Sequence, residues 1–193
     1  MRRPTVRVAA LALVLGAAPA CALAGHQTRP SSTAGFGWFR AAPPPAGWSA
    51  QSMPLRAGRL AVPPGLTVMP GDHGTVSAGR ELAGQIAVYL NATPQQGGET
   101  LTNWSSFRVE HLMAEDARSA HLDASATDLR FTGGQGSCVM DDYVTRVGAH
   151  HYREIACLVH GAAGGSVIVV AALTSAWADY QDVLRRVVDG YQL

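Results

Sequence analysis

The sequence predicts an α+β domain in which an antiparallel β-sheet of about six or seven strands is packed by two main helices. Short apolar runs recur along the chain, and the run at 167–173 has the length of a buried strand. The C-terminal segment instead has apolar side chains three and four residues apart, which is typical of a helix. A chain of 193 residues that is 47% apolar and 15% charged is expected to form one globular domain, neither disordered nor a long coiled coil.

The strands are expected where apolar and β-branched residues alternate between turn signals. They lie near 50–55, 59–62, 85–90, 128–132, 138–146, 152–159 and 166–173. Proline and glycine crowd the passage at 63–72, so the stretch 63–80 is predicted to be rich in turns. The glycine-rich segment at 133–137 is predicted to be a flexible turn, because a phosphate-binding loop needs a helix behind it and here a strand follows.

Two helices are expected in addition to these strands. The first spans 103–118 with Thr102 as its cap, and its amphipathic pattern is only fair. The second is the clearest element of the chain, and Ser175 is positioned to cap it while Asp179 lies at its positive end. Its apolar stripe consists of Trp177, Tyr180, Val183, Leu184, Val187, Val188 and Tyr191.

A hairpin joins the two cysteine-containing strands in this prediction. If the hairpin turns at Val147 and Gly148, Cys138 lies directly opposite Cys157, at a spacing that a disulfide can bridge. The same register also opposes Met140 to Ile155, Asp142 to Arg153 and Tyr143 to Tyr152. We therefore predict a disulfide between Cys138 and Cys157.

Residues 1–24 have the features of an export signal. Three arginines precede an apolar run that is too short to cross a bilayer but suits a signal peptide. Cleavage after Ala24 would follow the small-residue rule of ordinary signal peptidase. Cleavage after Ala20 would follow a sequence that resembles a bacterial lipobox, with Cys21 as the lipidated N-terminus. Intact mass of the cell-associated protein distinguishes the two.

The rest of the chain divides into a linker and a domain. Residues 25–47 are rich in proline, serine and glycine and are predicted to be a linker, and residues 48–193 form the single α+β domain. Either cleavage leaves Cys138 and Cys157 as an even pair, as expected in an oxidising compartment.

Every basic residue is arginine and only two residues are asparagine, which indicates a GC-rich bacterial genome.

Catalytic motifs are missing from the sequence. It contains no Gly-x-Ser-x-Gly elbow, no His-Glu-x-x-His and no dinucleotide fingerprint, and the absence of lysine excludes Schiff-base chemistry. The net charge of +1 produces no field directed at nucleic acid. No cofactor and no metal are expected. His111 and Glu115 are four residues apart on the predicted helix, and with His121 as a third candidate they could share a metal ion. Polar pairs at this spacing are, however, common on helix surfaces.

One polar cluster is a candidate site, on the hairpin face opposite the cysteines. The predicted register stacks Asp141 against Glu154, Tyr143 against Tyr152, and Thr145 against His150. Two facing carboxylates repel each other unless a proton, a cation or an arginine joins them. The cluster is therefore either a cation or carboxylate site, or a solvated or arginine-paired sheet face.

The order of these elements resembles a known family. Trp48 opens short strands that contain the sequence Ala-Val-Pro-Pro at 61–64, and the chain closes on an apolar strand at 167–172, Trp177 and a terminal helix. This pattern is similar to exported actinobacterial lipoproteins of the LpqN type and to the wider PsbP-like fold. The resemblance implies an antiparallel sheet with helices packed on it and a binding or accessory role, and it supplies no active site.

The function expected from these observations is that of an exported cell-envelope protein that binds a small ligand or another envelope protein. Its contact with the membrane would be limited to a lipid anchor on Cys21, at the outer face of the cell membrane. One alternative is a secreted hydrolase that uses Asp141, Glu154 and His150, which a deep pocket on that face would favour. Another alternative is a purely structural envelope protein, which would have neither a pocket nor an apolar patch.

Overall fold

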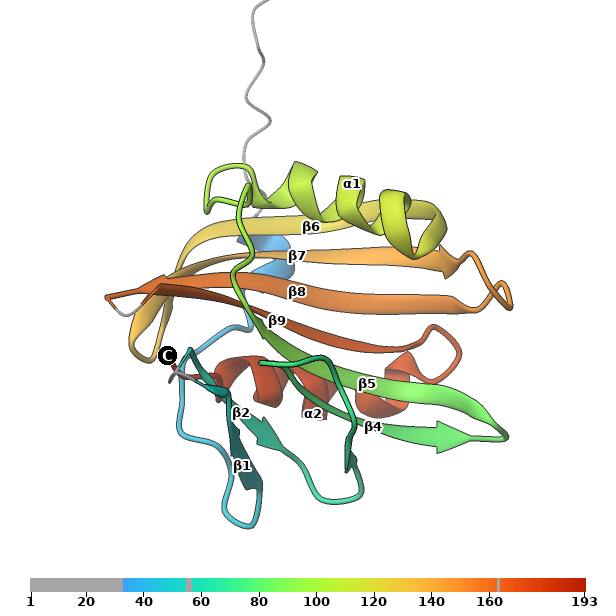
Figure 1. The fold of residues 1–193 in the computed structure, drawn as a ribbon, viewed down its shortest axis with the longest axis horizontal. Helices are drawn as coiled ribbons and strands as arrows, with labels where there is room; N and C mark the ends of the chain where they lie inside the picture. Colours follow the sequence, from blue (N-terminus) through green and yellow to red (C-terminus); the bar gives the residue numbers. More distant parts are fainter. Residues whose placement is uncertain (1–32, 55–56, 163) are drawn as a thin grey trace, which may run out of the picture. The chain divides into compact units, whose positions relative to one another are not determined.

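The computed structural model describes residues 33–54, 57–162 and 164–193. Within them, seven strands form one antiparallel sheet in the order β3-β4-β5-β9-β8-β7-β6, and β1 pairs with β2 separately (Figure 1). The elements are η1 (a 3₁₀-helix, Thr33–Phe36), β1 (Ser49–Ser52), β2 (Arg59–Val62), β3 (Thr67–Met69), β4 (Val76–Leu82), β5 (Gln85–Pro94), α1 (Trp104–Glu115), β6 (Ala117–Phe131), β7 (Gly134–Thr145), β8 (His151–Gly161), β9 (Gly164–Leu173) and α2 (Trp177–Asp189). The predicted α+β class, with an antiparallel sheet and two helices, is confirmed.

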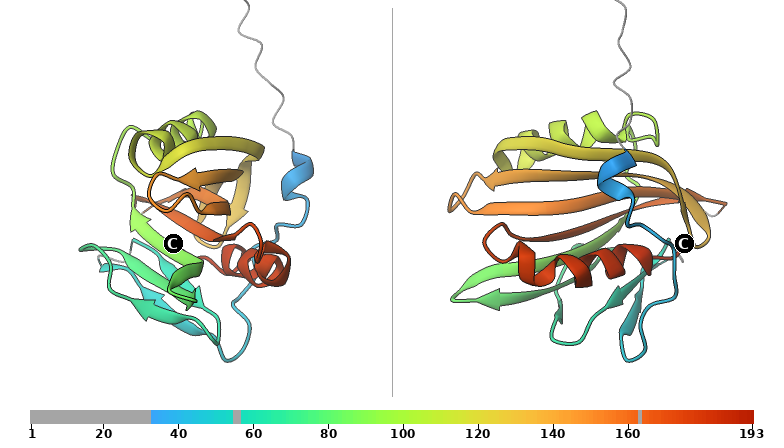
Figure 2. Two further views of the ribbon diagram at one scale, coloured as in Figure 1. Left: turned by 90° about the vertical axis from the view of Figure 1, so that its right-hand side faces the viewer. Right: turned by 180° about the vertical axis from the view of Figure 1, so that it is seen from behind.

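The connection from β5 to β6 determines where the first helix lies. β5 is next to β9 in the sheet, whereas β6 is the outermost strand beyond β8 and β7. The chain must therefore cross β9, β8 and β7, and α1 lies on this crossing, against one face of the sheet (Figure 1). α2 follows β9 and packs on the opposite face (Figure 2).

Each face of the sheet contributes its own apolar layer. The larger layer lies on the α2 side and includes Leu184 and Ile155. The smaller layer lies beneath α1 and includes Trp104, Val139 and Leu158. Because both faces of the sheet centre are covered, nearly every residue of β8 and β9 is buried. A strand with one solvent-exposed face would instead alternate between buried and exposed residues.

The stretch 63–80 has the predicted turns, at 64–65 and around 72–74, but it also contains β3 and most of β4, which were not predicted. The signal for β4 is weak since small residues occupy its buried positions, among them Ser77 and Gly79. A Cβ atom at Gly79 would lie 2.7 Å from the carbonyl oxygen of Val88 and 2.8 Å from the sulfur of Met69. Close approach of the backbone of β5 therefore requires a residue without a side chain at this position.

The region around α1 also differs from the prediction. α1 ends at Glu115 and β6 begins two residues later, so residues 117–127 are strand although only 128–132 was expected. β6 is an edge strand with three register irregularities, which conceal the period-two pattern of a regular strand. The strand β7 begins at Gly134, so most of the predicted glycine-rich turn belongs to the sheet.

Neither predicted helix cap is used. α1 is preceded by Asn103 in place of Thr102, and the Asn103 side chain accepts from the Thr100 amide at 2.7 Å and so holds the preceding loop. α2 is preceded by Ala176 in place of Ser175, because a turn that begins at Leu173 continues into the helix.

Residues upstream of Trp48 contribute to the core. Phe36 and Phe39 are buried, and the ring centroid of Phe39 lies 4.6 Å from that of Phe131. The second half of the segment predicted to be a linker, 25–47, therefore packs on the domain. The predicted export signal at 1–24, its two cleavage sites and Cys21 lie outside the described residues. In the described ranges, no helix is long and apolar enough to cross a membrane.

The β7–β8 hairpin has the predicted register. Cys138 pairs with Cys157, and all the other predicted pairs from Met140 with Ile155 to Tyr143 with Tyr152 are present. The two cysteines are joined by a disulfide, with their Cα atoms 4.0 Å apart, and both are buried in the α2-side layer.

Removal of this disulfide is expected to lower the free energy of unfolding by about 3 kcal/mol, because the bond restricts the unfolded chain. The bond closes a loop between residues 19 positions apart. Denaturant unfolding of the oxidised protein and of the Cys138→Ala/Cys157→Ala variant measures the difference. The reduced wild type is the control for packing lost with the sulfur atoms. Equal unfolding midpoints for oxidised and reduced protein would contradict the prediction.

Candidate functional site

A groove lies between α1 and the part of the same sheet face that α1 leaves uncovered. Its volume is about 1030 Å³, and its walls come from β5, α1, the loop between them, and the β7–β8 hairpin. Figure 2 shows α1 and α2 on opposite sides of the sheet, so this groove and the α2-side core are separate. The crossing of α1 over the sheet thus produces both a covered layer and a concave site beside it.

Aromatic side chains line the groove in two stacks. On α1, the Trp104 and Phe107 rings are stacked with centroids 6.1 Å apart, and Phe107 stacks on His111 at 6.0 Å. On the sheet, Tyr143 and Tyr152 face each other across the hairpin with centroids 5.6 Å apart. These rings make both walls of the groove aromatic.

Hydrogen bonds hold two of these rings in place. Trp104 Nε1 donates to the carbonyl oxygen of Ala156 at 3.0 Å, which ties α1 to β8. The Tyr152 hydroxyl donates to the carbonyl oxygen of Ile86 at 2.6 Å, which ties β8 to β5 below the groove. The aromatic walls are therefore positioned before any ligand enters.

Arg108 and Glu154 form an ion pair beneath α1. Arg108 Nε donates to Glu154 Oε1 at 2.7 Å and Nη2 donates to Oε2 at 2.9 Å, a bidentate geometry. The Glu154 side chain is fully buried and that of Arg108 is 12% exposed. Burial lowers the pKa of Arg108, but the Glu154 carboxylate, together with Asp141 and Tyr143, raises it; the net direction is upward, so the guanidinium remains charged.

Asp141 lies next to Glu154 on the neighbouring strand and is fully buried. Among the described residues, no donor lies within hydrogen-bonding distance of either Asp141 oxygen. Burial and the charge of Glu154 raise the pKa of Asp141 to about 9. Asp141 is therefore a neutral acid at pH 7. Together with the Arg108–Glu154 ion pair it forms a buried cluster whose net charge is close to zero. Burial also raises the pKa of Tyr143, and the Glu154 carboxylate adds to this effect.

The structure brings four of the five candidate residues together on the predicted face. Tyr143, Tyr152 and Glu154 line the groove, whereas Asp141, the strand partner of Glu154, is buried and is not part of the lining. His150 is in the hairpin connection, where its amide donates to Thr145 Oγ1 at 2.9 Å, and it does not line the groove. A pocket on this face is the feature expected of the hydrolase alternative, but Asp141, Glu154 and His150 do not converge in it.

Sequence reasoning did not assign Arg108 to the site. Arg108 lies one turn after Trp104 and just before His111 and Leu112, so helical spacing places it on the same stripe. The facing carboxylates of Asp141 and Glu154 require a proton, a cation or an arginine between them, and Arg108 is the arginine on this stripe of the helix. That signal was available in the sequence.

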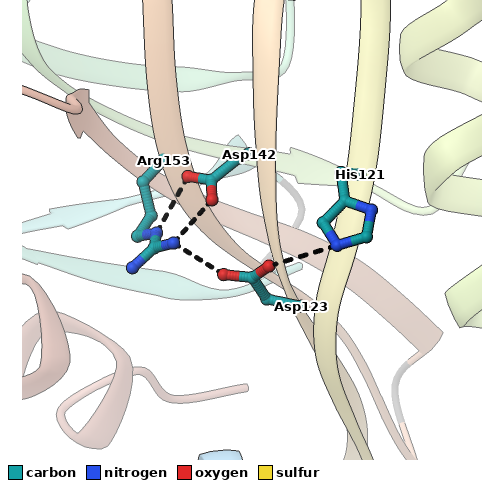
Figure 3. A network of polar contacts seen from close by, with 4 residues as sticks. All are labelled: His121, Asp123, Asp142 and Arg153. Carbon is teal, nitrogen blue, oxygen red and sulfur yellow. Dashed lines mark hydrogen bonds and ion pairs between the residues drawn. The ribbon is translucent and has the colours of Figure 1, made fainter.

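A second polar network lies on the other face of the sheet (Figure 3). Arg153 Nε donates to Asp142 Oδ1 at 2.8 Å, Arg153 Nη2 donates to Asp123 Oδ2 at 2.6 Å, and His121 lies 3.6 Å from Asp123. The Arg153 guanidinium also lies over the Trp177 ring, 6.0 Å from its centroid. Arg153 and Asp142 are about a third exposed, so these ion pairs contribute little to stability.

The histidines considered as metal ligands are apart from one another in the described part of the chain. His111 Nε2 lies 3.6 Å from Glu115 Oε2, and His121 is on the edge strand β6. No group of three or more His, Cys, Asp or Glu side chains in the described residues is arranged to hold a metal ion.

Comparison with known proteins identifies the fold. No protein-family model matches the chain, and no curated protein matches it. The chain is similar to the solution structure of the cyanobacterial PsbP protein of Synechocystis, with a TM-score of 0.53, 11% identity, and coverage of 76% of this chain and 92% of that chain. This similarity shows a PsbP-like fold.

Two more distant structures also match. One is LpqN of Mycobacterium tuberculosis, a protein involved in cell envelope biogenesis, with a TM-score of 0.39, 14% identity, and coverage of 78% of this chain and 80% of that chain. The other is a protein of unknown function from Pseudomonas aeruginosa, with a TM-score of 0.41, 8% identity, and coverage of 74% of this chain and 94% of that chain.

Proposed function

We propose that the protein is an exported accessory module of the cell envelope that binds a small, partly apolar ligand in the groove between α1 and the sheet. The observation that carries this proposal is the groove itself. Its volume of about 1030 Å³ is comparable to sites that hold small molecules, and such sites combine apolar walls with a few polar groups. The two aromatic stacks supply the apolar walls, and side chains such as Asn91, Thr93 and Glu115 supply the polar groups.

The chemistry of the groove favours binding over catalysis. Glu154 is the only one of the three hydrolase candidates in the groove lining, and both of its oxygens accept hydrogen bonds from Arg108. A carboxylate that is fully buried and has both oxygens bound to a guanidinium is not positioned to take a proton from a ligand, so it is a poor general base.

Export is proposed from the N-terminal sequence and the disulfide. The arginines and the apolar run within 1–24 support a signal peptide, and a disulfide such as that between Cys138 and Cys157 persists in oxidising compartments. Cleavage before Cys21 would anchor the protein at the outer face of the membrane as an actinobacterial-type lipoprotein.

A neutral fluorescent probe tests the groove. N-phenyl-1-naphthylamine is expected to bind saturably with one site per chain. Thr93 lies on β5 in the groove wall, and Thr67 lies exposed on β3 outside it, so the two allow a matched substitution. Thr93→Trp is expected to weaken binding roughly tenfold by filling the groove, whereas Thr67→Trp should bind like the wild type. Absence of saturable binding, or equal affinity of both variants, would refute the proposal.

A further inference from the structure

We infer that the ligand of the groove is a small organic cation with an apolar part, held where α1 ends beside the Tyr143–Tyr152 pair. This inference rests on the proposed function and adds the charge and orientation of the ligand. It depends on the charge of the groove lining, on the position of that charge along α1, and on the aromatic rings next to it.

The groove lining is negatively charged. Its charged side chains are the five acids Asp72, Glu99, Glu115, Asp116 and Glu154 and the two arginines Arg108 and Arg146, which leaves a net charge of −3 with neutral histidines. A cation entering this groove is attracted and an anion is repelled, because apolar walls focus the field of the lining charges.

Both arginines in the lining are already engaged. Arg108 binds Glu154 through two hydrogen bonds. Arg146 Nη2 donates to the carbonyl oxygen of Met113 at 2.7 Å and also contacts the carbonyl oxygens of Ala114 in α1 and Ala117 at the start of β6. A ligand anion would therefore compete with existing partners for either guanidinium.

Two exposed acids of the lining lie where α1 ends, and they outnumber the single Arg146 guanidinium there. Glu115 and Asp116 line the groove at the last turn of the helix, and the Glu115 side chain is 63% exposed. Asp72 lines the groove from the β3–β4 connection, beside Pro94, and so belongs to the other end of β5. Glu99, in contrast, is buried and accepts hydrogen bonds from the backbone amides of Gln96 and Gly97 at 2.7 and 2.8 Å, so it is less available to a ligand.

Aromatic rings continue from this acidic end into the groove. Phe107, His111 and Glu115 follow one another along α1 at four-residue spacing and all line the groove, opposite the Tyr143–Tyr152 stack. The faces of aromatic rings attract cations, quaternary ammonium groups in particular. The ammonium group is thus placed between the acidic end of α1 and the tyrosines, and the apolar part lies toward Trp104.

Displacement of bound N-phenyl-1-naphthylamine by a matched octyl series tests the inference. The probes are octyltrimethylammonium, octanol and octyl sulfate, each used below its micellar concentration. Octyltrimethylammonium is expected to bind roughly tenfold more tightly than octyl sulfate, with octanol between them. Equal or tighter binding of octanol or octyl sulfate would overturn the inference, and so would a lack of displacement by all three. In either case the groove would still bind the dye, and only failure of the dye itself to bind would refute the proposed function.

Charge reversal locates the cation. Glu115→Lys is expected to weaken octyltrimethylammonium roughly fivefold or more while changing octanol by less than about twofold. The matched control is Asp182→Lys, an exposed helical acid on α2 at the opposite face of the sheet, which should change neither affinity. Equal effects of the two reversals on octyltrimethylammonium would overturn the assignment of the cation to the end of α1.

Discussion

Replacement of Arg108 by methionine is expected to lower the free energy of unfolding by about 3 to 5 kcal/mol. The substitution preserves most of the side-chain volume but removes both hydrogen bonds to Glu154, whose side chain is fully buried. An uncompensated carboxylate then remains beneath α1, close to a second carboxyl group on Asp141. Equilibrium unfolding in guanidinium chloride, followed by circular dichroism, measures the loss.

Two further variants separate the buried charge from lost packing. The double variant Arg108→Met/Glu154→Met removes both charges and is expected to recover most of the lost stability, since apolar pairs replace buried ion pairs at little cost. Arg153→Met removes a bidentate partner of Asp142 on the other face, where both side chains are about a third exposed, and should cost at most about 1 kcal/mol. If Arg108→Met were no more destabilising than Arg153→Met, the ion pair would not have the role described.

Replacement of Asp141 by asparagine is expected to stabilise the protein at neutral and alkaline pH. Burial and the Glu154 charge raise the pKa of Asp141 from 3.8 to about 9 in the folded state. Between these values the folded chain retains a proton that the unfolded chain releases, so stability falls as pH rises. The fall approaches about 1.4 kcal/mol per pH unit and amounts to several kcal/mol over the range. Asparagine cannot ionise and removes this dependence.

Unfolding experiments at about pH 5 and about pH 8 test this expectation. The contribution of Asp141 is fully present below pH 3.8 and is lost as pH rises toward about 9, so the wild type should be less stable at the higher pH. Asp141→Asn should narrow that difference, whereas Asp142→Asn, on the other face, should lose under about 1 kcal/mol at either pH. Parallel pH profiles for wild type and Asp141→Asn would contradict the prediction.

The best-predicted part of the fold is the one whose contacts are local in sequence. The β7–β8 register follows from a short turn and from complementary pairs such as Asp142 with Arg153. β4 was missed because Gly79 and its small neighbours give little apolar signal, and Gly79 has no side chain because β5 approaches closely there. β6 was largely missed because an edge strand with bulges does not alternate regularly. In both strands the residue pattern reflects neighbours that are distant in sequence.

The candidate site shows the same division. Period-two alternation places Asp141, Tyr143, Tyr152 and Glu154 on one face, and the hairpin register places them opposite one another. Neither observation reveals that Arg108, which is 46 positions away along the chain, binds Glu154. Neither predicts the groove, because its second wall is α1 and its third is β5.

By itself, then, the sequence determines the α+β class, the terminal helix and the strand partners within the β7–β8 hairpin, since these depend on periodicity and on contacts across one turn. The tertiary structure decides what the hairpin face becomes. Because β5 pairs with β9 while β6 lies at the far edge, the intervening chain has to cross the face that carries Asp141 and Glu154. That crossing removes the two carboxyl groups from water, brings Arg108 to one of them, and leaves beside α1 the groove in which we propose a ligand binds.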